Sequence, residues 1–182
     1  MTRTRQGLEI TDPAAYRQKS LDLLGDRDAI EVMSGTVDVL AEIVGKHSVA
    51  HMRTRPFAGK WTPNEVIGHL VDAEWVLGFR LRVILAEENP DILGMDQELW
   101  VARQRYNDRA PGDLVRDFRS LRGINLPLWS GLSPADLKRS GNHNERGPES
   151  LDTMLRMYAA HDLHHVDQIN RYLQAAAGPA WQ

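Results

Sequence analysis

Apolar residues recur with a helical period over four long segments of the sequence, and no segment shows a clean period-2 alternation. Apolar positions three and four residues apart fall on one side of an α-helix, whereas alternate positions fall on one side of a strand. Long amphipathic helices bury their apolar stripes against one another. The pattern therefore predicts an all-α protein built on a four-helix bundle, with short extra helices between the long ones.

Start and stop signals place these helices along the chain. The strongest is Thr62-Pro63-Asn64-Glu65, because a threonine cap, a proline at the first helical position and a glutamate three residues later complete a capping box. The predicted long helices cover residues 29–45, 63–88, 111–132 and 151–175. The predicted shorter elements are helices at 12–25 and 96–105, a capped turn at 133–137 and a loop at 141–150. With no internal repeat and no candidate boundary, residues 1–182 are expected to form a single domain.

The composition argues against several classes of partner. A net charge of −3 gives no electrostatic reason to expect nucleic acid binding. No stretch approaches the roughly 20 apolar residues of a membrane span, and residues 1–6 are not followed by the apolar run of a signal peptide. Cysteine is absent, which removes disulfides, thiolate ligands and a cysteine nucleophile. We expect a cytoplasmic protein that acts on a small-molecule substrate.

Three histidines form the most informative polar pattern. His161 and His165 stand four residues apart in the last predicted helix, so both imidazoles can reach one cation, and His69 follows the capping box. On helical wheels His165 falls inside the apolar arc, His161 and His69 lie at the margins of theirs, and His164 falls roughly 60° beyond the edge. The pattern favours His69, His161 and His165 as ligands of one divalent metal ion and His164 as a rim residue. The alternative is a set of hydrogen-bonded core histidines.

Other polar residues near this pattern have different expected environments. Asp162 falls in the middle of an apolar arc, so it needs a partner such as a buried arginine or a hydrogen bond within the site. Gln168 lies on the histidine side and is a candidate to line the pocket. Asp72 falls on the outer side of its helix, where solvent exposure is expected and a ligand role is the alternative. Trp100 and Tyr106 are candidate pocket walls, with ordinary packing as the alternative.

Three further histidines have simpler interpretations. His143 lies in the predicted loop and is expected to be exposed, although it could swing toward a site. His47 and His51 lie near a helix end, where partial positive charge is favourable.

A second apolar stripe lies on the helix that contains His69, formed by Trp75, Phe79 and Val83. A helix that is apolar on two sides is buried on two sides, either by more of the same chain or by a second subunit. The stripe predicts a homodimer.

Two segments resemble a known family. They are KWTPNEVIGHLVDAE at residues 60–74 and HDLHHVDQI at residues 161–169, and they occur in the right order at helical positions. Together they resemble the DinB-like superfamily, and the resemblance extends over roughly residues 23–173. It implies an up-down-up-down four-helix bundle that holds a divalent metal ion through three histidines. Matched motif to motif, these are the same three residues that the wheels favour, and dimers are common in the superfamily.

The resemblance also suggests activities. Members include S-transferases and isomerases that use bacillithiol, mycothiol or glutathione, and proteins assigned as metal-dependent hydrolases. We rank first a thiol S-transferase, in which the metal activates a low-molecular-weight thiol brought in as cosubstrate. The alternatives are a hydrolase with metal-activated water, for which Asp72, Glu74 and Asp162 are the acidic candidates for a general base, and a metal-binding stress protein without turnover. Zinc, nickel, iron or copper would each suit three imidazoles.

Overall fold

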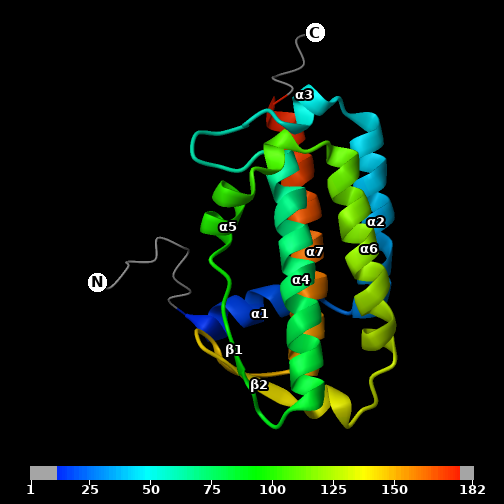
Figure 1. Ribbon diagram of the computed structural model, residues 1–182, viewed down its shortest axis with the longest axis vertical. Helices are drawn as coiled ribbons and strands as arrows, with labels where there is room; N and C mark the ends of the chain where they lie inside the picture. The colour runs from blue at the N-terminus through cyan, green and yellow to red at the C-terminus, as the bar shows by residue number, and fades with distance from the viewer. Residues whose placement is uncertain (1–11, 177–182) are drawn as a thin grey trace, which may run out of the picture.

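The computed structural model describes residues 12–176, so residues 1–6, which bear on the signal peptide, lie outside the described residues. The four long helices are α2 (Ala29–Lys46), α4 (Pro63–Ala86), α6 (Pro111–Ser130) and α7 (Leu151–Ala176), and they form the bundle in Figure 1. The shorter helices are α1 (Pro13–Leu24), α3 (Val49–Met52), α5 (Gln97–Gln104), η1 (Tyr106–Asp108) and η2 (Asp136–Lys138). The strands are β1 (Asp91–Ile92), β2 (Ser140–His143) and β3 (Gly147–Ser150). The mostly helical class and the four-helix bundle are confirmed.

The four long helices do not run in the expected up-down-up-down order of directions. Figure 1 shows α2 and α7 running upward and α4 and α6 running downward, which is up-down-down-up. Hydrogen bonds support the parallel run of α4 and α6, because Asn64 at the start of α4 donates to the Arg109 carbonyl and Arg82 near its end donates to Asn125. The physical reason is the long connection at 87–110. It returns along the bundle through β1, α5 and η1, so α6 begins at the same end as α4.

A small three-stranded sheet replaces the loop predicted at 141–150. β2 pairs antiparallel with β3 and parallel with β1, so the strand order is β1-β2-β3. Gly141 lies so close to α4 that an added Cβ would stand 3.0 Å from a side-chain carbon of Ile84. Gly147 adopts a φ of +74° where the hairpin turns. Strands this short have no periodicity that distinguishes them from a loop.

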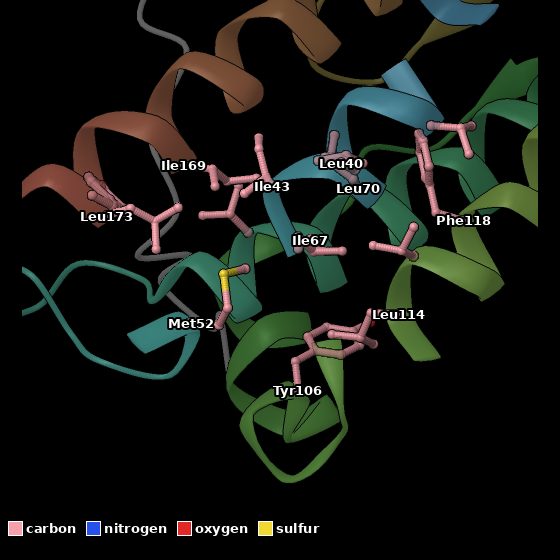
Figure 2. Packing of buried hydrophobic residues seen from close by; sticks show 14 of the residues in the cluster. Leu40, Ile43, Met52, Ile67, Leu70, Tyr106, Leu114, Phe118, Ile169 and Leu173 are labelled. Atoms are coloured by element: carbon pink, nitrogen blue, oxygen red, sulfur yellow. The ribbon is translucent and has the colours of Figure 1, made fainter. Parts of the chain in front are cut away.

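Two apolar clusters fill the bundle, and a buried ionic layer separates them along the helices. One cluster lies toward the α3 end, where residues such as Leu70, Phe118 and Ile169 pack (Figure 2). The other includes Leu77 of α4 and Trp129 of α6. Between them Arg122, 3% exposed, binds Asp162 and Glu74. The expectation that Asp162 needs a buried partner is confirmed, and the partner is an arginine from α6.

The predicted capping box at the start of α4 is present. The Thr62 hydroxyl accepts from the Glu65 backbone N–H at 3.1 Å, and the Glu65 carboxylate accepts from the Thr62 backbone N–H at 2.7 Å. These two bonds satisfy donors that a helix start otherwise leaves unpaired. They fix where α4 begins and therefore where His69 lies, two turns into the helix.

None of the helices within residues 12–176 combines the length and the apolar content needed to cross a membrane.

The second apolar stripe of α4 lies on the surface of the chain. Trp75 is 64% exposed and Phe79 is 59% exposed, while Val83 is half-buried.

Candidate metal centre

The three histidines converge where α4 and α7 pack antiparallel. The Nε2 atom of His161 lies 3.0 Å from Nε2 of His69 and 3.0 Å from Nε2 of His165. One ligand atom from each ring lies within 4.8 Å of the other two. His69 comes from α4, and the other two come from successive turns of α7. The structure therefore brings together the residues that the wheels selected.

Hydrogen bonds around His165 determine which of its nitrogens faces the other rings as an acceptor. Nδ1 lies 2.7 Å from Oε1 of Gln168, and the Gln168 amide group donates to the Tyr172 hydroxyl at 2.9 Å. Because an amide oxygen only accepts, Nδ1 of His165 carries the proton and Nε2 presents its lone pair. A ligating histidine typically donates its second ring N–H in this way. Gln168 thus orients a ring of the cluster.

Burial holds the triad in its neutral form. Loss of solvent is the main cause that lowers the pKa of each of His69, His161 and His165 well below its usual range, and neighbouring histidines lower it further. Neutral imidazoles are the form that binds metal ions. His69 and His165 are buried, whereas His161 is half-buried. The rings are therefore in the form that coordinates a metal ion, and His161 is the partly exposed member of the cluster.

The donor set fits a divalent cation. Metal–nitrogen bonds of about 2.0–2.1 Å place neighbouring ligand atoms of one coordination sphere about 3 Å apart. Both Nε2 separations that involve His161 are 3.0 Å. Nδ1 of His69 is buried without a hydrogen-bond partner, so this ring is held by packing, including a contact with Trp61 at 5.0 Å between ring centroids.

His164 lies outside the cluster. Its side chain is exposed, and its ring stands edge-on to His165 with 5.0 Å between centroids. This exposed position agrees with the prediction that His164 is a rim residue. His47 follows the end of α2, and Nε2 of His51 lies 3.0 Å from the Leu173 carbonyl oxygen of α7.

The expected exposure of Asp72 is wrong. The residue is 6% exposed, and Gln104 donates to its Oδ1 at 3.3 Å. Burial raises the pKa of Asp72 to about 6, against a hydrogen bond from Tyr106 that lowers it. A wheel could not anticipate this environment, because it comes from η1 and the end of α5, which pack on the outer side of α4. Tyr106 itself is buried with its ring over Gly68.

The expected exposure of His143 is also wrong. Its side chain is 1% exposed, because the predicted loop folds into β2. Burial is the main cause that lowers its pKa to about 4.

Sequence reasoning also missed three residues near the site, namely Trp61, Arg80 and Tyr158. Of these only Trp61 had a usable signal, since it adjoins the capping box. Trp100 is 37% exposed on α5.

Comparison with known proteins adds family membership to this geometry. A family model described as the DinB superfamily matches residues 34–169, which is most of the chain. The chain belongs to the DinB superfamily.

Curated relatives of this chain carry names that describe a function. A protein from Bacillus mycoides strain KBAB4 is 33% identical over 114 residues, covering 61% of this chain and 64% of the relative. One from Oceanobacillus iheyensis is 33% identical over 113 residues, covering 62% and 64%. Both are named "Putative metal-dependent hydrolase". The matched region spans slightly less than two thirds of each relative.

A solved structure shares the fold. YfiT from Bacillus subtilis superposes with a TM-score of 0.75 and 21% sequence identity, covering 95% of this chain and 92% of its own. It is described as "a probable metal-dependent hydrolase with an unusual four-helix bundle topology". The likeness supports the bundle described above.

Proposed function

We propose that this protein is a metal-dependent hydrolase whose metal ion is held by His69, His161 and His165. The observation that carries the proposal is the convergence of one nitrogen from each ring within 4.8 Å. The names of the curated relatives support hydrolysis rather than the thiol S-transfer that we ranked first. A divalent cation, when bound, supplies Lewis acidity that lowers the pKa of a water molecule toward 7.

The residues around the triad have separable roles. The three neutral rings bind the cation, and Gln168 fixes the ring of His165 through Nδ1. Trp61 packs on His69 and donates from its indole nitrogen to Glu98 at 3.1 Å. This contact covers one side of the triad and limits the approach of bulk water there.

Asp72 is the candidate general base. Glu74 and Asp162 are both engaged by Arg122 in the ionic layer, which leaves Asp72 as the available member of the three acidic candidates. Asp72 lies three residues after His69, and positions with this spacing are neighbours on a helix surface. Its pKa of about 6 leaves it ionised at neutral pH. A base poised near the working pH is the effective kind.

The test is hydrolysis of ester and amide substrates by metal-loaded protein, measured with and without added thiols. We expect turnover that needs no thiol, is lost in His69→Ala and persists in His164→Ala. Asp72→Asn should lower kcat by about 10²-fold or more while metal content stays unchanged. Turnover only in the presence of a thiol would support the transferase instead. Thermal stabilisation by metal without any turnover would support the non-catalytic alternative.

A further inference from the structure

Tyr158 connects the histidine triad to a second group of buried polar side chains. Its ring lies 6.0 Å from the ring of His161 between centroids, and its hydroxyl accepts from Nη1 of Arg80 at 3.0 Å. Arg80 is 4% exposed and also donates from Nη2 to the Leu93 carbonyl. One half-buried tyrosine therefore separates the triad from a buried guanidinium.

His143 belongs to the same group. Pairing of β1 with β2 places His143 opposite Ile92, directly beside the residue whose carbonyl binds Arg80. The backbone N–H of Glu145 donates to Nδ1 of His143 at 3.1 Å, so the ring proton is on Nε2. Nε2 of His143 and Nε of Arg80 are both buried without a hydrogen-bond partner. Two N–H donors on neighbouring side chains thus lack an acceptor.

The charge of the group is also unbalanced. Arg146 forms a two-point ion pair with Glu149 at 2.6 and 2.7 Å, so these two residues neutralise each other. Arg80 forms no ion pair with any carboxylate in residues 12–176. A buried cation needs a counter-charge, and buried donors need acceptors. A water molecule could accept both hydrogen bonds but would leave the charge unbalanced, whereas a carboxylate supplies two acceptor oxygens and one negative charge.

We propose that Arg80 and His143 bind a carboxylate group of the substrate, on the far side of Tyr158 from the triad. The inference rests on the hydrolase proposal for the identity of the bound molecule as a substrate. It narrows that substrate to a carboxylate-bearing ester or amide, with the scissile bond at the triad and the carboxylate at Arg80. Tyr158 and His161 are both half-buried, so the two residues that lie between the cation site and Arg80 are each partly exposed.

The kinetic test compares release of 4-nitrophenolate from two esters of similar size, mono-4-nitrophenyl glutarate, whose other end is a carboxylate, and its uncharged methyl ester. Arg80→Met should raise KM for the charged ester by about tenfold or more and leave kcat/KM for the neutral ester within about twofold. Arg82→Met is the matched control, because it removes an equal charge from the exposed side of α4 and should affect neither substrate. Equal losses on both esters, or no loss on either, would overturn the proposal.

A second variant and a second measurement keep the test independent of folding and of turnover. His143→Phe removes one donor while it keeps a flat ring, and it should weaken the charged ester selectively if Arg80→Met does not fold. In metal-free ¹⁵N-labelled protein, glutarate should shift the Nε–H signal of Arg80 saturably in the wild type and in Arg82→Met, but not in His143→Phe. A wild type that hydrolyses neither ester while this titration saturates would refute the hydrolase and retain the carboxylate site. An unresponsive Arg80 signal would refute the site itself.

Discussion

Arg122 binds both oxygens of Asp162, with Nη1 at 2.8 Å and Nη2 at 3.2 Å, and Asp162 is the residue next to His161. The same guanidinium binds Glu74 of α4 through Nε at 2.9 Å and the Met33 carbonyl of α2. One buried side chain from α6 therefore contacts all three other long helices. Because α4 and α7 carry the histidines, this layer fixes the relative position of the two helices at the level of the triad.

Removal of Arg122 should be strongly destabilising. Arg122→Met leaves two carboxylates buried without their counter-charge, for which about 3–5 kcal/mol is the usual loss. Urea titration of the wild type and the variant measures this loss as the difference between their free energies of unfolding. Arg119→Met is the matched control, because Arg119 pairs with Asp38 on the surface, where an ion pair contributes about 1 kcal/mol or less. Similar losses in both variants would contradict the role of the layer.

Gly68 should not tolerate a methyl group. A Cβ at this position would stand 2.2 Å from the ring of Tyr106, which is itself buried. Gly68→Ala should destabilise the protein by about 1–3 kcal/mol, because the ring must move. Gly123→Ala, on a helical position with no atom within 4 Å of the added Cβ, should instead stabilise it by up to about 1 kcal/mol. Thermal denaturation of the two variants distinguishes crowding from a general effect of alanine, and a stable Gly68→Ala would refute the contact.

His143 should make stability depend on pH in a defined window. Burial lowers its pKa from an ordinary 6.5 to about 4, with the charges of Arg146 and Arg80 as further causes. Unfolding therefore takes up a proton between these values. The contribution of neutral His143 to the free energy of unfolding is complete above about pH 6.5. It falls by up to about 1.4 kcal/mol per pH unit as the pH decreases toward 4. Urea titrations at a series of pH values give the free energy of unfolding of the metal-free wild type and of His143→Phe. This free energy should depend less steeply on pH in the variant, and an equal pH dependence in both proteins would contradict the low pKa of His143.

The exposed stripe on α4 leads us to propose a homodimer. Trp75 and Phe79 are more than half exposed, and a second copy of the chain would bury them. Sedimentation velocity should give a dimer mass for the wild type and a monomer mass for Phe79→Glu, with the helical spectrum unchanged. A monomeric wild type at high concentration would rule out the proposal.

Helix positions and the shared face of His161 and His165 can be predicted from the sequence because their signals are local, whereas the approach of His69 depends on the packing of α4 against α7. Thr62 and Glu65 mark the start of α4 through bonds three residues apart, and the spacing of His161 and His165 places both rings on one side of α7. His164 is adjacent to His165 in the sequence, and its position on the helical wheel is what distinguishes it from the two ligand candidates. Such features depend on helical geometry that each segment carries by itself.

Features that depend on the connections between helices cannot be predicted in this way. The burial of Asp72 comes from Gln104 and Tyr106, which reach α4 only because residues 87–110 return along the bundle. The same connection sets the direction of α6 in the bundle. This direction determines that Arg122 of α6 lies beside Asp162. The burial of His143 depends on the pairing of three short strands that have no clear sequence pattern.

Metal content tests the central claim most directly. Protein purified without a histidine tag should contain about one equivalent of a divalent metal per chain by elemental analysis, and His164→Ala should retain it. His69→Ala, His161→Ala and His165→Ala should each lose it, because each removes one nitrogen of the cluster. Metal retained by all three variants, or a wild type that binds none when zinc, nickel and iron are supplied, would contradict the account.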